Sequence, residues 1–283
     1  MAVDRKQVKV TIGTNVIQTG EAYDWTLLSI KGHDFMDIDV PIDNYAEADG
    51  GYITNRRYLP RYVTMRIRSK LSTPAQIDAT ALLLKRYLDI EENVELTIYE
   101  HGVTRIGNGV ITNVKHPDGH KWRDQPYIVL TIGLPDPWFL GEEETPAFRT
   151  AIPLLTFPWN SMTGVGITSG YVTSGNVVTV TNDGHQEAGF VLTMNATGAV
   201  VNPTVTNQDG DYIKILKTFS TGESVVISTV RGDKYVRCDG ASCTYDRAST
   251  FFGLAVGENT ITISADSGAD NLTKSLKFSP RYR

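Results

Sequence analysis

Short runs of alternating apolar and polar residues, separated by turn residues, recur along almost the entire chain. Successive side chains of a β-strand point to opposite faces of a sheet, so each run predicts a strand with one buried face. Before Pro135 these runs lie at 8–12, 35–40, 63–69, 94–100, 110–114 and 127–134. After Pro146 they lie at 176–182, 189–194, 212–216, 224–229, 235–238 and 259–264. Turn residues recur about every ten positions in this second half, as in an antiparallel β-sandwich. The sequence therefore predicts a mainly β fold.

One segment, STPAQIDATALLLKRYLDI at 72–90, has the pattern of a helix instead. Thr73 can cap its first turn, Pro74 suits the first helical position, and Gln76 completes a capping box. The apolar residues of the segment then recur at spacings of four, three and four, which places on one face Ile77, Ala81, Leu84 and Leu88. We expect a single amphipathic helix packed on a sheet.

The stretch TIGLPDPWFLGEEETP at 131–146 divides the chain. A chain of 283 residues is long enough for two domains. Pro135 is expected to end the last strand of the first domain, and the three glutamates are expected to form a solvated tether. The prediction is an N-terminal β-sandwich or barrel-like domain with one helix at 1–140, a linker at 141–150, and a C-terminal β-sandwich at 151–283. Trp138 and Phe139 are expected to fill the seam between the two domains.

Composition narrows the class of protein. The chain carries 27 lysines and arginines against 32 aspartates and glutamates, a net charge of −5, whereas a general nucleic-acid binder is basic. No apolar run approaches the roughly 20 residues that cross a bilayer, and the start of the chain lacks a signal-peptide core. A protein made and folded in a cytoplasm is expected. Cys238 and Cys243 flank an Asp-Gly turn, so a disulfide is geometrically possible, but a cytoplasmic setting favours free thiols.

No set of residues in the sequence combines into a catalytic site. His116 and His120 have the spacing of a helical zinc site, but Pro117 and Gly119 favour a turn. There is neither a Walker loop nor a dinucleotide-binding glycine motif, and the loop at 170–176 is not a nucleophile elbow. Asp37 and Asp39 share a strand face, which is a common surface pattern and weak support for glycosidase chemistry. We expect a protein that is not an enzyme, with no cofactor and no metal site.

Charge is segregated in the first domain. Residues 34–49 contain six acidic side chains and no lysine or arginine, and residues 56–70 contain six basic side chains and no acid. One interpretation is that neighbouring strands pair these charges within a subunit. The other is that an acidic edge and a basic edge of different copies meet head to tail, which closes a ring. The second interpretation gives a candidate subunit interface made of Asp34, Asp37, Asp39, Asp43, Arg56, Arg57, Arg61, Arg66 and Arg68.

Several segments together resemble the distal tail proteins (Dit) of long-tailed siphophages, and the resemblance covers nearly the whole chain. In the first half they are NRRYLPRYVTMRIRSKL at 55–71, the helix that follows, and LPDPWFLG at 134–141. In the second half they are NPTVTNQDGDYIKI at 202–215, GESVVISTVRGDKYVRCDG at 222–240 and GLAVGENTITISAD at 253–266. Each string is weak alone, and their order is what carries the resemblance.

The resemblance implies a structural protein of the phage tail tip, assembled in the host cytoplasm and located in the virion. Six copies of the N-terminal domain would form a ring below the tail tube, and a galectin-like C-terminal sandwich would project outward. Its partners would be the tail tube protein, the tail-tip hub or tail-associated lysin, and in some members receptor-binding proteins. Genomic DNA would cross the ring without specific binding. The family brings no catalytic residues and no membrane contact.

A glycan-binding module is the alternative function, because a galectin-like sandwich can hold sugars. Sugar rings stack on exposed aromatic faces, and the second domain offers few candidates: Trp159, Tyr171, Tyr212, Tyr235 and Tyr245. Tyrosines in strands more often serve packing. These tyrosines are spread through the sequence, so we expect a docking and spacing module without sugar affinity.

Overall fold

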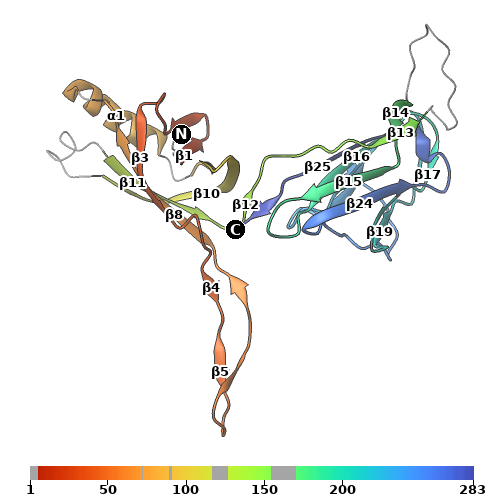
Figure 1. The fold of residues 1–283 in the computed structure, drawn as a ribbon, viewed down its shortest axis with the longest axis horizontal. Helices are drawn as coiled ribbons and strands as arrows, with labels where there is room; N and C mark the ends of the chain where they lie inside the picture. The colour runs from red at the N-terminus through yellow and green to blue at the C-terminus, as the bar shows by residue number, and fades with distance from the viewer. Residues whose placement is uncertain (1–5, 72, 89–90, 117–126, 154–169) are drawn as a thin grey trace, which may run out of the picture. The chain divides into compact units, whose positions relative to one another are not determined.

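The computed structural model describes residues 6–71, 73–88, 91–116, 127–153 and 170–283. The chain divides into two compact units (Figure 1). Unit 1 comprises Met1–Glu142 together with Tyr282–Arg283, and unit 2 comprises Glu143–Arg281. Strands dominate both, which confirms the mainly β class. No helix in the described ranges is long and apolar enough to cross a membrane.

Unit 1 is built on an antiparallel sheet with the strand order β2-β1-β9-β10-β11-β8-β3. Its strands are β1 (Gln7–Ile12), β2 (Asn15–Gln18), β3 (Trp25–Lys31), β8 (Arg61–Ser69), β9 (Val94–Glu100), β10 (Val103–Lys115) and β11 (Tyr127–Leu134), with β12 (Phe139–Leu140) and β26 (Arg281–Tyr282) paired beside β10. Alternate side chains of β1, β8 and β11 are buried, so their apolar positions share one core.

The predicted helix is confirmed as α1, Pro74–Tyr87. Ile77 and Leu84 are buried in the core of unit 1, and Ala81 and Leu88 pack partly buried against it, as the apolar spacing predicts. The capping box is wrong in detail, because the Thr73 side chain makes no hydrogen bond to the helix backbone. Its hydroxyl instead donates to Oε1 of Gln76 at 2.6 Å, so the two side chains satisfy each other.

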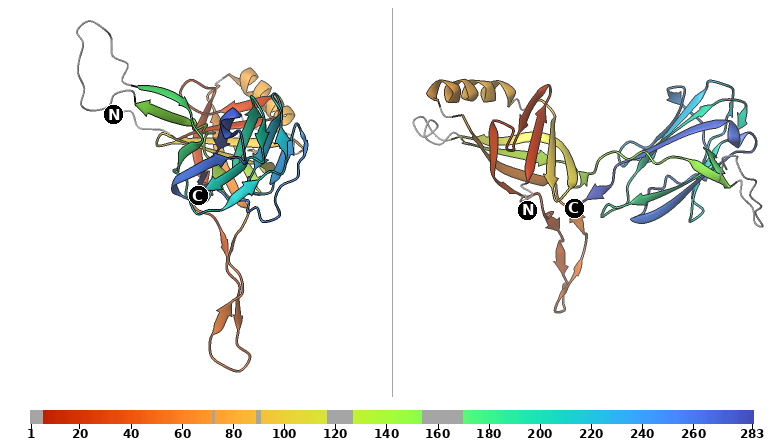
Figure 2. Two further views of the ribbon diagram at one scale, coloured as in Figure 1. Left: turned by 90° about the vertical axis from the view of Figure 1, so that its right-hand side faces the viewer. Right: turned by 45° about the horizontal axis from the view of Figure 1, so that its top comes forward.

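Between β3 and β8 the chain leaves the sheet as a narrow two-stranded projection, which we call the arm, residues 34–60 (Figures 1 and 2). Its strands are β4 (Ile38–Asp39), β5 (Ile42–Asn44), β6 (Gly51–Ile53) and β7 (Arg57–Tyr58); β4 pairs with β7, and β5 with β6. The strand expected at 35–40 shrinks to two residues, because Pro41 interrupts pairing and no second sheet layer covers this segment.

Unit 2 contains two antiparallel sheets, with the orders β15-β24-β18-β19 and β23-β22-β21-β16-β25. Their apolar faces contribute to one core, in which Phe190 and Leu192 of β16 are buried with Val205 of β18 and Ile261 of β24. The strands are β15 (Val177–Asn182), β16 (Phe190–Ala196), β18 (Thr204–Asn207), β19 (Tyr212–Lys214), β21 (Ser224–Ser228), β22 (Tyr235–Cys238), β23 (Ala241–Ser242), β24 (Gly257–Ser264) and β25 (Leu272–Phe278).

Smaller pairs complete unit 2. They are β13 (Arg149–Pro153) with β14 (Gly170–Ser174), and β17 (Val200–Val201) with β20 (Thr218–Phe219); a 3-10 turn, η1 (Ala269–Asn271), precedes β25. The loop expected at 170–176 thus begins as strand β14.

The segment after Pro135 differs from the expected seam and free tether. Phe139 is fully buried in the core of unit 1, where Gly107 leaves room for its ring, and Trp138 stacks edge-on against Tyr58 at 5.5 Å. Phe139 therefore belongs to the interior of unit 1 and does not fill a seam between domains. The following residues already belong to unit 2: Glu144 bridges to Phe278, and Phe148 enters the core of that unit. Only a short stretch near Glu142 separates the two units.

Candidate functional site

The arm pairs one acid and one base of the segregated charges within a single subunit. Because β4 and β7 are in register, Asp39 lies opposite Arg57, and Nε and Nη2 of Arg57 each lie 2.7 Å from Oδ2 of Asp39. Asp43 accepts a 2.7 Å hydrogen bond from the hydroxyl of Thr54. Asp39 and Arg57 thus pair within one subunit, as the first interpretation of the segregated charge predicts. Arg56 is exposed, and its side chain stays available to a neighbour.

The arm also exposes a series of large apolar side chains, which the sequence analysis overlooked because it followed the charges. Phe35 is 89% exposed, and Ile38 and Ile42 are more than 60% exposed. Val40, Tyr45, Tyr52, Ile53 and Tyr58 add to the same exposed set. A two-stranded hairpin is marginally stable alone in water, and contiguous exposed apolar surface marks an interaction site. The arm is therefore the candidate functional site of unit 1.

The three arginines of β8 have different surroundings. Arg61 is buried, donates a 2.7 Å hydrogen bond to the backbone oxygen of His33, and lies over the ring of Phe139. Burial, with Arg105 nearby, lowers the pKa of Arg61 to about 10. Arg66 is half-buried over the ring of Tyr127, and Arg68 is exposed. Arg61 is thus part of the interior of unit 1 and is removed from the candidate interface.

A compact ionic cluster lies where the arm leaves the sheet. The ring of His33 is almost fully buried, and its Nε2 contacts Oδ1 of Asp34 at 2.9 Å and the ammonium of Lys6. Lys6 also lies 2.7 Å from Oε1 of Glu100, whose second oxygen is 3.7 Å from Arg105. No spacing rule predicts this cluster, because Lys6 precedes β1, His33 and Asp34 follow β3, and Glu100 and Arg105 lie in β9 and β10.

Burial shapes the charge states in this cluster. Burial, followed by the charge of Lys6, lowers the pKa of His33 below its ordinary value, so the ring is neutral near pH 7. Burial alone would raise the pKa of Glu100, but the hydrogen bond and charge of Lys6 bring it below its ordinary value. The cluster thus contains a neutral imidazole and ionised carboxylates facing an ammonium.

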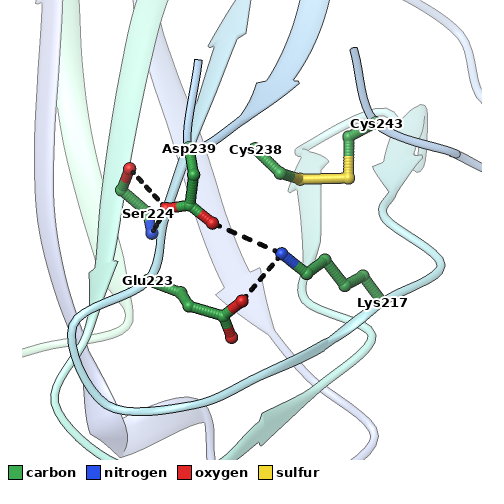
Figure 3. Close-up of a disulfide and its surroundings, with 6 residues drawn as sticks. All are labelled: Lys217, Glu223, Ser224, Cys238, Asp239 and Cys243. Carbon is green, nitrogen blue, oxygen red and sulfur yellow. Dashed lines mark hydrogen bonds and ion pairs between the residues drawn. A yellow bond between two sulfur atoms is a disulfide. The ribbon is translucent and has the colours of Figure 1, made fainter. Parts of the chain in front are cut away.

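In unit 2, Cys238 and Cys243 form a disulfide across the hairpin of β22 and β23 (Figure 3). Asp239 and Gly240 both have positive φ, at 50° and 83°, which suits a tight two-residue hairpin turn. The turn brings the two Cα atoms within 5.4 Å. The expectation of free thiols is wrong here, since it rested on the assumed compartment and the hairpin geometry favours the bond.

Two of the tyrosines proposed for sugar binding lie on paired segments. The segment after residue 243 pairs with β19 and its continuation so that Tyr245 lies opposite Ile215, and Asp246 accepts a 3.1 Å hydrogen bond from the hydroxyl of Tyr212. Tyr245 is 41% exposed and stacks edge-on with Phe251. Tyr235 lies apart, under the guanidinium of Arg237. Trp159 and His120 lie outside the described residues, as do most of the turn expected at 116–120 and the side chain of Tyr171.

Comparison with known proteins shows which family part of the chain matches and which solved structures share its fold. Residues 183–282 match the family model of the siphovirus-type tail component, C-terminal domain. The solved structure of SPP1 Dit (gp 19.1), a hub adsorption apparatus protein, superposes with a TM-score of 0.64 at 13% identity, covering 98% of this chain and 99% of that one. A chain of the phage P2 baseplate in its activated conformation with Ca gives 0.56 at 11% identity, covering 98% of both. No curated protein sequence matches the chain.

The two kinds of match support different statements. Identities of 11–13% establish the fold over the whole chain, and the family match establishes the class through unit 2. Residues 183–282 therefore belong to the siphovirus-type tail component, C-terminal domain family. The whole chain has the fold of SPP1 Dit, which agrees with the sequence resemblance to the distal tail proteins.

Proposed function

We propose that six copies of this chain form a ring that joins the tail tube to the tail-tip hub. Unit 1 forms the ring and surrounds the channel through which the genome passes without specific contacts. Unit 2, a galectin-like sandwich, projects outward and meets the tail-associated lysin or receptor-binding proteins. The role is structural and not catalytic, and the protein acts in the virion after assembly in the host cytoplasm.

The observation that carries this proposal is the exposed apolar arm. Phe35, Ile38 and Ile42 each leave more than half of their side chain in water within unit 1. Burying apolar surface gains about 25 cal/mol per Å², so a neighbouring copy that covers these side chains stabilises the assembly. A closed ring gives every copy such a neighbour, because its head-to-tail contacts repeat until the rotation closes.

An arm-shortened variant tests the ring. Asp37 accepts a backbone hydrogen bond from Leu59 at 2.9 Å, so a short glycine-serine turn can join these two positions without disturbing β3 or β8. The full chain should have about six times its 31.2 kDa monomer mass in light scattering, and images along its axis should show six-fold symmetry. The shortened variant should be monomeric. Its circular dichroism spectrum should differ from that of the full chain only by the loss of the arm.

Two further variants serve as controls. Ile42→Ser should weaken the ring, whereas Val177→Ser, at an exposed apolar position of unit 2, should leave it intact. Exchanging Asp39 and Arg57 for each other preserves an internal ion pair and should therefore preserve the ring. A full chain that stays monomeric at high concentration, or a shortened variant that still forms hexamers, contradicts the proposal for the arm.

The glycan-binding alternative has one observation in its favour, the exposed ring of Tyr245 in a segment whose Asp246 binds the hydroxyl of Tyr212. An exposed aromatic ring next to polar groups is the arrangement that small-ligand sites use. Calorimetry of the full chain against host wall polysaccharide decides the question. Saturable heat that Tyr245→Ala removes, and that Tyr235→Ala leaves unchanged, would favour the alternative. We expect no saturable heat.

A further inference from the structure

Three potential metal ligands converge at the base of the arm. The ligand atoms of His33, Asp34 and Glu100 all lie within 4.8 Å of one another. Nε2 of His33 is 2.9 Å from Oδ1 of Asp34 and 3.9 Å from Oε2 of Glu100. Ligands that share one tetrahedral zinc ion at about 2.1 Å are about 3.4 Å apart, so these distances bracket the required separation.

The surroundings of His33 indicate that a cation belongs at this point. Its Nε2 faces both the ammonium of Lys6, which only donates, and the carboxylate of Asp34, which only accepts. A neutral ring cannot serve both partners with one nitrogen, whichever tautomer it adopts. Its Nδ1 is buried and has no hydrogen-bond partner in the described chain. A cation that accepts lone pairs from Nε2 and from both carboxylates removes this conflict.

We propose that His33, Asp34 and Glu100 form a binding site for a divalent transition-metal ion of the zinc type, and that the Lys6 ammonium takes the place of the ion in the metal-free protein. One imidazole nitrogen with two carboxylate oxygens suits zinc and its neighbours better than calcium or magnesium, which prefer oxygen ligands alone.

The local structure permits the exchange of ammonium for metal. The Lys6 side chain is 23% exposed and unbranched, so its ammonium can swing into water. Asp34 is 60% exposed, which opens one side of the site to the ion and to water ligands. The backbone of His33 is held by the hydrogen bond from Arg61, which keeps the ring in place. The positive charges of Arg61 and Arg105 oppose a second positive charge and limit the affinity.

A metal at this site would connect the base of the arm to the sheet. Asp34 begins the arm, His33 directly precedes it, and Glu100 ends β9. The ion pair of Lys6 with Glu100 now joins β9 to the residue just before β1. Exchanging it for metal coordination would transfer this connection from the start of β1 to the start of the arm.

Titration of the full chain, freed of metal with a chelator, tests the site with Zn²⁺ by calorimetry and with Co²⁺ by its visible absorption. One site per chain is expected. Asp34→Asn and His33→Gln should each weaken Zn²⁺ binding by at least about tenfold. Lys6→Met, which removes the competing ammonium, should tighten it by about two- to tenfold, the range expected for loss of a partly buried ion pair. His101→Gln is the matched control, because His101 neighbours Glu100 but is 81% exposed, and it should change nothing.

The outcomes separate the site from adventitious surface binding. Absence of Zn²⁺ binding in both the unaltered chain and the Lys6→Met variant overturns the proposal. Zn²⁺ binding that survives Asp34→Asn but disappears with His101→Gln also overturns the proposal. Asp34 is exposed, so the Asp34→Asn result stands by itself even if His33→Gln fails to fold. These measurements need no ring, and their failure leaves the proposed function untouched.

Discussion

Arg61 shows how the position of one side chain decides its role. Its guanidinium packs on the ring of Phe139, donates to the backbone oxygen of His33, and leaves Nε and Nη2 buried without partners. A charge in that setting is costly to bury, so it is retained for the packing and the hydrogen bond it supplies. The side chain of Arg68, on the same strand, is exposed to solvent.

We therefore predict opposite results for two substitutions on β8. Arg61→Ala should lower the free energy of unfolding of unit 1 by about 2–4 kcal/mol, because it leaves a cavity on Phe139 and an unpaired carbonyl. Arg68→Ala should change it by no more than about 0.5 kcal/mol, as is usual for an exposed position. Urea unfolding of the full chain, followed through the transition of unit 1, measures both. Equal effects would contradict an interior role for Arg61.

A pH effect is expected from Lys217, whose ammonium lies 3.0 Å from Glu223 and 3.4 Å from Asp239 (Figure 3). The backbone N–H of Ser220 donates to Glu223, and that of Ser224 donates to Asp239. These hydrogen bonds, and after them the ammonium of Lys217, lower the pKa of the two carboxyl groups. A lowered pKa contributes stability above the unfolded values of 4.5 and 3.8, and this contribution is lost as the pH falls through the folded values.

Lys217→Met should accordingly reduce the stability of unit 2 more at pH 6 than at pH 3. The decrease of stability with falling pH, which we call the acid limb, should therefore be less steep. Lys234→Met, which removes a lysine bonded to a backbone oxygen, should leave the shape of that limb unchanged. Thermal unfolding at a series of pH values measures the difference. Parallel acid limbs for Lys217→Met and the unaltered chain would show that the ammonium contributes nothing to these pKa shifts.

At the scale of single elements, the disulfide hairpin gives a further prediction. The bond closes a loop with a sequence separation of 5, and the entropy lost by so small a loop in the unfolded chain corresponds to about 2 kcal/mol. The double substitution Cys238→Ala with Cys243→Ala should therefore lower the stability of unit 2 by about that amount. A thiol assay of the unaltered, denatured chain should find no free thiol. Two free thiols per chain would contradict the bond.

The strands show which elements the sequence can predict. β8 and β9 were predicted because alternating burial leaves a regular pattern, as in VTMRIRS at 63–69. β3 was not predicted, because a register shift between Leu27 and Ser29 interrupts its alternation. β25 was also missed, since its lysines and threonine obscure the buried positions Leu272, Leu276 and Phe278. A local sequence pattern fails to predict a strand where a bulge shifts the alternation of buried and exposed positions, or where long charged side chains obscure it.

The candidate site was only partly predictable for a related reason. Charge segregation drew attention to residues 34–70, and the arm does lie there. Its exposed apolar side chains carry no signal of their own, because the sequence of an exposed strand resembles that of a buried one. The ionic cluster of Lys6, His33 and Glu100 depends on strand order, since β1 pairs with β9, and no local pattern encodes that order.

At the scale of the whole molecule, the chain passes between the units twice. It leaves unit 1 after Glu142 and returns at Tyr282, which packs partly buried against the core of unit 1. Arg283 follows, 6.0 Å from the ring of Trp138. Composition predicts a linker at 141–150 and places the entire C-terminus in the second domain. Composition identifies a linker, but it carries no information about a terminal strand that returns to a distant core.

This double passage leads to a prediction about fragments. A fragment of residues 143–281 should fold alone as an all-β protein, because it contains the complete core of unit 2. A fragment of residues 1–142 should fold but be less stable than unit 1 in the full chain, since it lacks Tyr282. In the full chain, Tyr282→Ala should lower the unfolding free energy of unit 1 by about 1–3 kcal/mol, less than for a fully buried aromatic residue, and leave unit 2 unchanged. Calorimetry resolves the two transitions. If residues 143–281 are unfolded by circular dichroism, or if Tyr282→Ala shifts the transition of unit 2 alone, this division of the chain is wrong.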